Sequence, residues 1–506
     1  MFVKIKERIQ ELKGPFEKWF PPIRLGIILL GIILSILLFI PPINGAVDDG
    51  SYNLILRANG LREYTNNADY FKYFVPKFPI LQYYNPDTDV YLSLQNILIQ
   101  AAILLNKIFY STQIFDIRFL SAIYVVLFLI GVRQLFKGLT FRLRGFKAYM
   151  IVLVGVFLLS DTTYTIYFNS FYIEPLDYIM VIYFVAFGLR AFQQSDPQKI
   201  MKFYGGQVFV VFLLMFVSRQ IAFLLGAFCF CLIGGIVFIK GRKWKLSAII
   251  LVSSLIPLSV YMGSLYSNPG YNENIYQSMT LGAMPASKEP GKDLAKIQVD
   301  PQNEMLRGTF YSEPYAIVSS DSSTIQQGFI DELSYGKLIL YYIKHPTVTL
   351  NLLQMGLESK NSTREDVSAF EKNAVKQSDE NKVFFQWAAG IKGLILPKKI
   401  GFYGLFAILV ISLYSVSMVR GLQMGSKLYL SIWFMNIGLL MIMFLSFFAP
   451  IIVSGETSIT RQLMMTSVIL DILVLLVLSD SIHHNIWINK ETVLLTKMKG
   501  NNENEE

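Results

Sequence analysis

Long uninterrupted apolar runs dominate the chain and recur at intervals that suit membrane-crossing helices. The first run, Leu25 to Ile40, contains no charged residue. About 20 helical residues cross the hydrocarbon core of a bilayer, and lipid offers no partner to open backbone groups, so each long run predicts a transmembrane helix. The pattern predicts about ten such helices, at residues 24–42, 117–136, 147–160, 175–192, 204–217, 221–239, 246–265, 400–419, 428–449 and 461–480.

The apolar stretch 203–239 requires two helices rather than one. It is interrupted by the polar run Ser218, Arg219 and Gln220, and it is too long for a single crossing. An arginine in the middle of a bilayer would also be costly. Two short helices with Ser-Arg-Gln at the turn between them satisfy both constraints.

The distribution of positive charge predicts the orientation. With the N-terminus inside, the predicted cytoplasmic pieces hold 23 Lys and Arg, whereas the short outside turns 161–174, 218–220 and 450–461 hold only Arg219 and Arg461. Because Lys and Arg concentrate in cytoplasmic loops, we expect a multi-pass protein of the cell membrane with both termini cytoplasmic. The net charge of +9 then results mainly from the Lys and Arg that orient the helices in the membrane, and it does not predict a nucleic-acid partner.

Two long segments are predicted on the outer side. The first, 43–116, contains the apolar stretch 93–108, which we expect to be an interfacial helix, since a crossing there would invert every later loop. The second, 266–399, is polar but keeps frequent Tyr, Phe, Leu and Ile, which predicts a small, mostly helical extracytoplasmic domain. The predicted organisation is a cytoplasmic amphipathic helix at 1–23, a seven-helix module at 24–265, the domain at 266–399, three further helices at 400–480 and a cytoplasmic tail at 481–506. For residues 1–23, a charged flank that only sets the orientation is the alternative.

Composition agrees with a membrane protein, since 53% of the residues are hydrophobic and only 16% are charged. Soluble proteins keep roughly a quarter of their residues charged. The two cysteines, Cys229 and Cys231, lie two apart in an apolar run and would face different sides of a helix, so we expect no bridge between them. The three histidines have no ligand spacing with a cysteine, and we expect no metal site of the Cys/His type.

The first candidate site is the run Val47 to Tyr52, which directly follows the first predicted helix on the outer side. Its adjacent carboxylates, Asp48 and Asp49, repel each other, and this repulsion raises the pKa of one of them toward a value suited to a general base. Gly50 would let the backbone approach a substrate closely. The alternative is a polar loop that caps the next helix, which explains one aspartate but not both.

The second candidate is the aromatic loop between Asp161 and Glu174, which includes Asn169 and Tyr172. Aromatic residues at a membrane boundary are typical of an interfacial belt, although their flat faces also suit stacking on sugars. The loop contains no cation, so its two acids are not paired locally. A divalent cation, a polar substrate and water are the alternative ligands of these acids.

Two isolated cations form the third candidate, a phosphate site. Arg219, beside Gln220, and Arg461 each lie next to a predicted helix on the outer side. The donors of arginine match phosphate oxygens, although an arginine at such a place can also extend to lipid headgroups. Asp471 lies about ten residues deeper than Arg461. An acid inside a membrane is a functional suspect, but a hydrogen bond to Ser or Thr explains it equally well, and we leave it out of the predicted site.

The order of these elements resembles the GT-C fold of polyprenyl-phosphate-dependent membrane glycosyltransferases. The resemblance rests on the acidic run Asp48-Asp49-Gly50-Ser51-Tyr52 after the first helix, the second acidic loop, and a large outer segment after the seventh helix. The first run is similar to the Asp-Glu pair of protein mannosyltransferases and to the Asp-Gly-Tyr-like run of bacterial oligosaccharyltransferases. The run 167–175 is similar to glycan-assembly hexose transferases of Gram-positive bacteria. The large segment has no clear match to the oligosaccharyltransferase signature.

The resemblance implies an inverting transfer of a sugar, a hexose by analogy, from a polyprenyl-phosphate carrier to a cell-surface glycan, lipid or polymer on the outer face. Asp49 or Asp48 would take the proton from the acceptor hydroxyl, and cations would stabilise the departing phosphate. The other implied positions are Asp161, Glu174, Asn169 and Tyr172 for substrate binding and Arg461, Arg219 and Gln220 for the donor phosphate. No metal is implied, and a divalent cation stays an alternative.

Two other functions compete with this one. A transporter or flippase of lipid-linked glycans is expected to have internal repeats and broken helices with polar groups at the midplane. The sequence has no evident repeat, and its polar motifs gather at the outer side. A membrane scaffold would not need carboxylates and arginines at one face. We therefore expect an enzyme.

Overall fold

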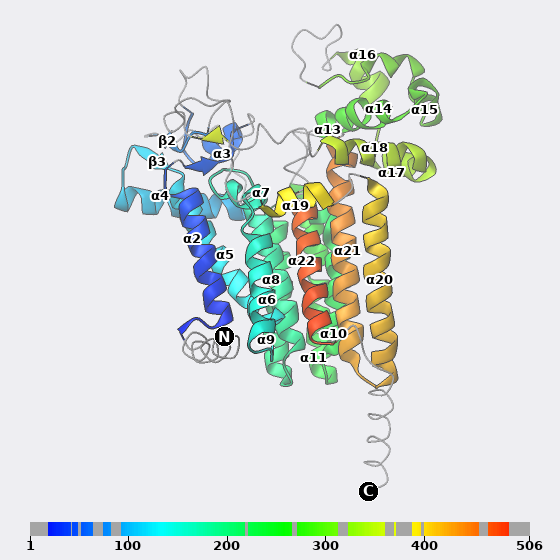
Figure 1. The fold of residues 1–506 in the computed structure, drawn as a ribbon. Helices are drawn as coiled ribbons and strands as arrows, with labels where there is room; N and C mark the ends of the chain where they lie inside the picture. The colour runs from blue at the N-terminus through cyan, green and yellow to red at the C-terminus, as the bar shows by residue number, and fades with distance from the viewer. Residues whose placement is uncertain are drawn as a thin grey trace.

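The computed structural model is a bundle of long helices covered at one end by shorter elements (Figure 1). It describes residues 19–41, 43–48, 52–63, 74–81, 93–217, 221–265, 271–311, 322–359, 369–370, 387–395, 399–454 and 464–484.

A helix lies in each of the ten ranges that the apolar pattern predicts. The bundle helices are α2 (Pro22–Leu38), α5 (Arg118–Leu139), α6 (Phe146–Leu159), α8 (Glu174–Phe192), α9 (Pro197–Met215), α10 (Ile221–Phe238), α11 (Arg242–Ser253) with α12 (Leu255–Leu265), α20 (Ile400–Gln423), α21 (Lys427–Ser454) and α22 (Met464–Ile482). Within the described residues, six helices are long and apolar enough to cross a membrane, or seven if α6 and the segment Thr162–Phe168, bent by 51°, form one span. The protein is therefore a multi-pass helical membrane protein.

Glycines allow the bundle helices to approach closely. In α5, Gly131 and Gly138 face Tyr183 and Leu189 of α8, and an added Cβ at either glycine would lie 2.9 Å from the opposing side chain. Small residues at helix crossings are typical of membrane bundles, because packing rather than water exclusion drives association there. The two cysteines of α10 are both free, as the sequence predicts.

Both ends of the described chain lie at one end of the bundle, which we call the terminal end. Tyr149, near the start of α6, donates a hydrogen bond to the carbonyl of Phe20, just before α2. Near the end of α22, Ser479 Oγ donates to the carbonyl of Leu139, the last residue of α5. The start of α2, the α5–α6 connection and the end of α22 therefore lie side by side.

The opposite end, the domain end, carries a helix that lies across the bundle. This helix, α4 (Leu94–Phe109), buries Gln95, Ile99, Ala102, Ile103 and Asn106 and exposes Ile97, Leu104 and Ile108. A helix forms at the predicted residues 93–108, and its exposed apolar side chains suit contact with lipid, while its position at the membrane interface stays a prediction. Two short strands, β2 (Lys77–Pro79) and β3 (Ile114–Asp116), pair in antiparallel fashion beside it.

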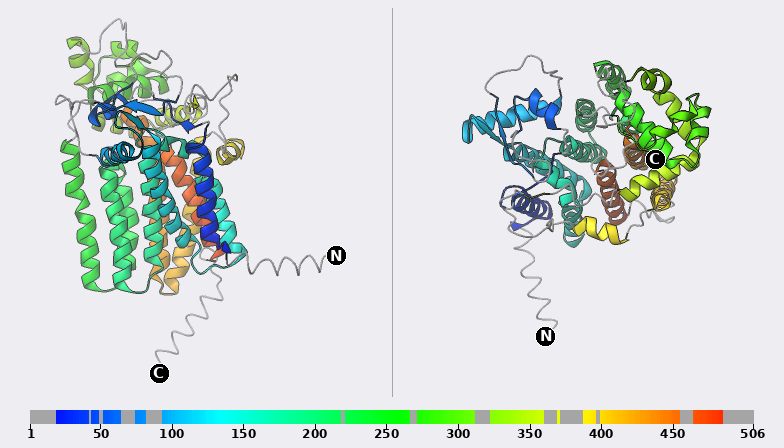
Figure 2. Two further views of the ribbon diagram at one scale, coloured as in Figure 1. Left: turned by 90° about the vertical axis from the view of Figure 1, so that its left-hand side faces the viewer. Right: turned by 90° about the horizontal axis from the view of Figure 1, so that it is seen from above.

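A small helical domain covers the other side of the domain end (Figure 2). Its core includes Leu294, Phe329 and Leu353 and is separate from that of the bundle, although Phe447 of α21 contributes to it. Its elements are α13 (Tyr271–Gln277), η3 (Ser278–Ala283), α14 (Met284–Ala286), α15 (Pro290–Lys296), η4 (Pro301–Leu306), α16 (Ser323–Ile325), η5 (Gln326–Ile330), α17 (Tyr335–Lys344) and α18 (Pro346–Ser359).

Two later elements of the predicted 266–399 domain contact the bundle side instead. The strand β4 (Ala369–Phe370) pairs with β1 (Asn44–Gly45), which follows α2. The helix α19 (Trp387–Ile395) lies across the bundle near α22, and Lys392 of α19 reaches Asp471 within α22. Both long segments of the chain therefore meet at the domain end, beside the first acidic motif.

Candidate functional site

Asp48 lies just after β1 and is almost completely buried. Its Oδ1 accepts a hydrogen bond from the backbone N–H of Tyr52, 3.2 Å away, at the start of the short helix α3 (Tyr52–Ala58). Side-chain acceptors at this position satisfy one of the open N–H groups of a helix. The capping role that competed with catalysis therefore applies to Asp48, while Asp49 lies outside the described residues.

Tyr52 ties the first motif to the aromatic loop. Its ring packs edge-on against Phe171 and Tyr172, with centroids 5.3 and 4.8 Å apart. Burial, together with the nearby Tyr172 and Asp48, raises the pKa of the Tyr52 phenol well above its ordinary value. The phenol therefore stays neutral at physiological pH and does not act as a base.

Asn169 and Tyr172, two predicted substrate-binding residues, bind the backbone at the start of the first motif and in the residues that lead into it. Asn169 Nδ2 donates to the carbonyls of Leu38, 3.0 Å away, and Asn44, 2.7 Å away. The Tyr172 hydroxyl donates to the carbonyl of Val47 at 2.7 Å. The structure thus brings the two motifs together, and these side chains position the acidic loop. We call these three hydrogen bonds the loop clasp.

Two further contacts fix the loop clasp from outside. Gln95 of α4 donates to the carbonyls of Phe171 and Tyr172. In addition, Gly45 lies under the ring of Phe74, and an added Cβ would overlap that ring. Only glycine allows this approach, so this contact also holds the backbone that precedes Asp48.

Glu63 is a neighbour of Asp48 that the sequence analysis did not identify. Burial and the negative charge of Asp48 raise the pKa of the Glu63 carboxyl, and Arg57 partly opposes this shift. Two carboxylates within electrostatic range hold a proton more readily than one. Glu63 therefore adds a second carboxyl group within electrostatic range of Asp48.

Asp161 and Glu174 have different neighbours, although the sequence places them at the two ends of one loop. Asp161 Oδ1 accepts from the N–H of Thr163 at 2.9 Å and caps the short helix α7 (Thr162–Thr165). Glu174 begins α8 one turn before Asp177, whose Oδ1 is buried and has no hydrogen-bond partner among the residues that the structure describes.

A cluster of charged side chains lies beneath α19. Lys392 Nζ contacts Asp471 Oδ2 at 2.7 Å and the Tyr164 hydroxyl of α7 at 2.9 Å. The Tyr164 hydroxyl also donates to Asp471 Oδ2 at 2.8 Å. The Asp471 side chain is 3% exposed, whereas that of Lys392 is 22% exposed. We call these three residues the α22 cluster. The hydrogen-bond partners of Asp471 are therefore a lysine and a tyrosine, rather than the Ser or Thr that the sequence suggested.

The predicted phosphate-binding residues, Arg219, Gln220 and Arg461, lie outside the described residues. In the part of the chain that the structure describes, no group of three or more His, Cys, Asp or Glu is arranged to hold a metal ion. Lys392, which the sequence analysis did not single out, pairs with Asp471 and is the cation of the α22 cluster.

The fold and its polar end define a polytopic helical membrane protein whose extramembrane segments converge on one face. Residues 6–504 match the family described as the YfdI N-terminal transmembrane domain, and the chain belongs to this family. Searches of curated proteins and of solved structures gave no match.

Proposed function

We propose that the protein is an inverting glycosyltransferase of the GT-C type. It would move a sugar, a hexose by resemblance, from a polyprenyl-phosphate carrier to a cell-surface glycan, lipid or polymer. The main support is the loop clasp, because Tyr172 of the second motif binds Val47 at the start of the first motif and Asn169 binds the backbone that leads into it. In this proposal all ten bundle helices cross the membrane, and the domain end is extracytoplasmic.

The charges at the terminal end support this orientation. The residues around the helix ends there include many Lys and Arg, which by the positive-inside rule belong in the cytoplasm. They are Arg142, Arg144, Lys147, Arg190, Lys199, Lys202, Lys240, Arg242, Lys243, Lys245, Arg420 and Lys427. The acidic motifs then face the outer side, where a lipid-linked donor and a surface acceptor would meet.

The proposed reaction is a single displacement. Asp49 or Asp48 takes the proton from the acceptor hydroxyl, and the acceptor oxygen forms a bond to the anomeric carbon as the bond from that carbon to the phosphate oxygen breaks. The polyprenyl phosphate leaves with the electron pair of that bond, and the anomeric configuration inverts. Arg461 and Arg219, with Gln220, are the proposed partners of the leaving phosphate, whereas Asp161 and Glu174 are proposed to face the substrate.

The buried surroundings of the first motif suit a general base. Asp48 accepts one hydrogen bond from the N–H of Tyr52, and this bond orients the Asp48 carboxylate. Glu63 is close enough for the charge of Asp48 to raise its pKa, and by the same repulsion Asp48 is a better proton acceptor when Glu63 is ionised. Asp49 follows Asp48 directly in sequence. The Asp49→Asn and Asp48→Asn variants show which of the two is the base.

The test is sugar transfer by purified protein in nanodiscs, from a panel of polyprenyl-phosphate sugars. We expect the variant of the true base, Asp49→Asn or Asp48→Asn, to lose about 10²–10⁴-fold in rate while it stays folded. Asp331→Asn, an exposed aspartate of the domain, is the matched control and should transfer like the wild type. Wild-type rates in both site variants would exclude this mechanism.

A transporter or flippase of lipid-linked glycans is the second candidate. The 51° break between α6 and the segment Thr162–Phe168 favours it, because broken helices are typical of transporters. The same nanodisc preparations, reconstituted as vesicles, distinguish the two functions. Movement of lipid-linked glycan between leaflets, without transfer from any donor of the panel, would replace the enzyme by a flippase.

A further inference from the structure

The helix α17 is apolar on two opposite faces, one buried in the domain and one exposed. Residues three and four apart share one side of a helix, so the members of each face form a continuous stripe. One stripe is enough to attach a helix to its own domain, and the second stripe needs a different partner. The buried face consists of Leu338, Tyr341 and Tyr342, and the exposed face, which we call the α17 face, consists of Ile339, Leu340 and Ile343.

The buried side of α17 is directed toward the domain core. The Tyr341 hydroxyl donates a hydrogen bond to Asp293 Oδ2 of α15, 2.9 Å away. The Tyr342 hydroxyl lies 3.5 Å from the carbonyl of Ser278 in η3. In Figure 1, α15 lies farther from the bundle than α17 does. The α17 face lies on the opposite side of the helix and is therefore directed away from the domain core.

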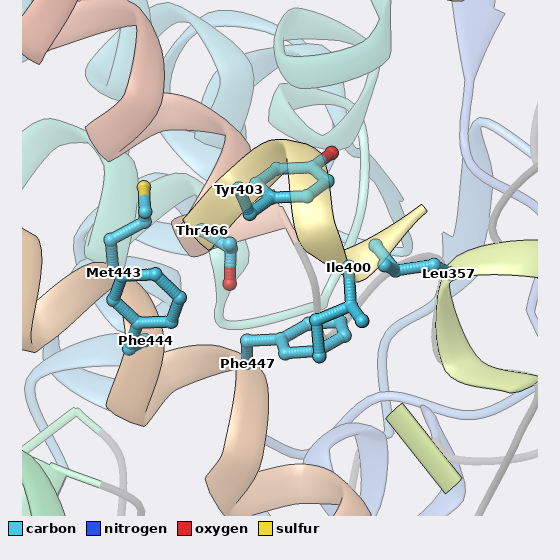
Figure 3. Close-up of a pocket in the computed structure, with 7 residues that line it drawn as sticks. All are labelled: Leu357, Ile400, Tyr403, Met443, Phe444, Phe447 and Thr466. Atoms are coloured by element: carbon cyan, nitrogen blue, oxygen red, sulfur yellow. The ribbon is translucent and has the colours of Figure 1, made fainter. Parts of the chain in front are cut away.

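The next helix, α18, fixes the level of α17 relative to the bundle. Gln354 of α18 accepts a hydrogen bond from the backbone N–H of Ile400, the first residue of α20, at 3.3 Å. Leu357 of α18 also lies with Ile400 and Tyr403 around a small apolar cavity where the domain meets the bundle (Figure 3). Only His345 separates α17 from α18, and α17 also contacts α21. The helix α17 therefore lies level with the domain end of the bundle.

The α17 face continues the surface that the bundle presents to lipid. The helix α20 is long and apolar enough to cross a membrane, and it exposes Leu405, Ile408 and Leu409 in its first three turns. Figure 1 shows α17 and α18 across the bundle axis, directly beyond the start of α20. Lys344 is exposed in the last turn of α17, and a lysine at such a place extends its charged end to the lipid headgroups. Both the apolar face and its flanking charge therefore suit a lipid surface.

Exposure of the α17 face to water would be unfavourable. Burial of one Leu or Ile side chain changes an equilibrium constant by about 10- to 100-fold. Adjacent large apolar side chains on a surface are typical of an interaction site. A helix with such a face, lying across the bundle at its end, has the features of a helix that lies in a membrane interface.

We propose that α17 lies in the membrane surface at the domain end, with the α17 face among the lipid chains just below the headgroups. The partner of this face is the bilayer. The helical domain is then held at two places, by α18 on the bundle and by α17 on lipid, and this double attachment fixes its position over the end of the bundle. The inference depends on the membrane fold and not on the proposed sugar transfer.

The experiment measures the accessibility of spin labels on the full-length protein in lipid nanodiscs. Cys229→Ala/Cys231→Ala removes the native cysteines, and single cysteines are then introduced for labelling. Oxygen concentrates in lipid and a neutral nickel chelate in water, so the ratio of the two accessibilities reports depth. We expect Ile343→Cys to prefer oxygen as strongly as Leu405→Cys, on the lipid-facing side of α20. Met305→Cys is the matched control and should prefer the nickel chelate, because Met305 is 73% exposed, against 71% for Ile343, but lies on η4, which contacts α15.

A second variant changes the α17 face itself. Leu340→Asp/Ile343→Asp places two charges on this face and leaves the buried face intact. It should shift the equilibrium from lipid-bound to free helix by at least about tenfold per side chain. A label at Ile339→Cys should then change from oxygen preference to nickel preference. Met305→Asp is the control substitution and should leave the oxygen preference of this label unchanged.

Two results would overturn the proposal. If Ile343→Cys prefers the nickel chelate as Met305→Cys does, the α17 face lies in water. If Ile343→Cys is shielded from both reagents, protein covers the face, and a second copy of the chain or another protein replaces the bilayer as its partner. Sugar transfer is no part of either measurement, so the proposed function stands or fails separately.

Discussion

The loop clasp and the α22 cluster are neighbours at the domain end, but they are held by different interactions. In the loop clasp, neutral side chains of Asn169 and Tyr172 bind backbone carbonyls. In the α22 cluster, two charged side chains and a phenol bind one another. Neutral bonds to the backbone define a shape and do not respond to ions, whereas a lysine can exchange one anion for another. The first region therefore sets geometry, and the second can respond to charge.

The two kinds of contact also differ in what their loss costs. Removing one partner of a buried ion pair costs about 3–5 kcal/mol, because the other charge is left unpaired. Leaving a buried backbone carbonyl without its donor costs about 1–3 kcal/mol. Substitutions in the α22 cluster should therefore mainly affect stability, while those in the loop clasp should affect the position of the acidic loop.

The largest effect is expected from Lys392→Met alone. This change leaves Asp471 as an unpaired buried charge, and we expect a loss of about 3–5 kcal/mol in the free energy of unfolding. The measurement is unfolding of the purified protein in mixed micelles by added denaturing detergent. Lys392→Met/Asp471→Asn should recover most of the loss. A double variant as unstable as the single one would show that the ion pair is not the cause.

A smaller effect on stability, with a clear effect on activity, is expected from Asn169→Leu. The carbonyls of Leu38 and Asn44 lose one shared donor group, and we expect a total cost of about 1–3 kcal/mol. Sugar transfer by the folded fraction should fall at least about tenfold, because displacement of a catalytic group by about 1 Å is enough for this. Asn436→Leu is the control, since the Asn436 amide binds a carbonyl of its own helix. Equal activity losses in both variants would argue against a specific role of the clasp.

Tyr172→Phe should have a milder effect of the same kind. It removes one hydrogen bond, from the hydroxyl to the carbonyl of Val47, and should cost about 1 kcal/mol. Tyr178→Phe removes a matched bond to the carbonyl of Leu159 within the bundle. The two variants should lose similar stability in thermal unfolding, but only Tyr172→Phe should reduce the transfer rate. If the transfer rate of Tyr172→Phe is unchanged, only the two hydrogen bonds of Asn169 in the loop clasp matter for activity.

The smallest effect is expected in the domain, at a third polar cluster. Burial raises the pKa of Asp293, but hydrogen bonds from Ser287, Lys296 and Tyr341 outweigh this and lower the pKa below its ordinary value. The stability that results is fully present above the unfolded-state pKa, about 3.9, and is lost as the pH falls through the lower folded-state pKa.

Thermal unfolding between about pH 6 and pH 3 tests this sign. As the pH falls, the thermal unfolding midpoint of the wild type should decrease more steeply than that of Asp293→Asn, because the variant has no carboxylate at this position to bind a proton. Transfer at neutral pH should be unchanged in the variant, since Asp293 lies in the domain core. A parallel pH profile of the two proteins would mean that Asp293 does not contribute.

The helices of the bundle could be predicted from sequence, because each is a long apolar run with a physical reason to be helical in lipid. The meeting of the first and second motifs could be suspected from their shared side of the membrane, but not established. Asn169 and Tyr172 were expected to bind substrate. Their actual partners are backbone carbonyls more than 120 residues away, and no sequence pattern encodes such a contact.

Of the α22 cluster, the sequence indicated Asp471 but not its partners. Asp471 stands out because an acid in an apolar run is costly, yet the expected partner was Ser or Thr. Its actual partner, Lys392, lies 79 residues earlier on the short helix α19, and nothing in the local sequence distinguishes this lysine from other surface lysines. Glu63 was missed for a similar reason, because its environment depends on how α3 places it near Asp48.

The pairing of β1 with β4 has a consequence for how the protein is made. Roughly 325 residues separate the two paired strands, so the first acidic loop emerges from the ribosome long before its partner exists. At about 5–20 residues per second, this interval is roughly 16–65 s. During that time the backbone of Asn44 and Gly45 has an open edge, which can pair with other chains. Assembly of the site is therefore a late step of biogenesis, and a truncated chain that ends before Ala369 would insert its early helices without completing it.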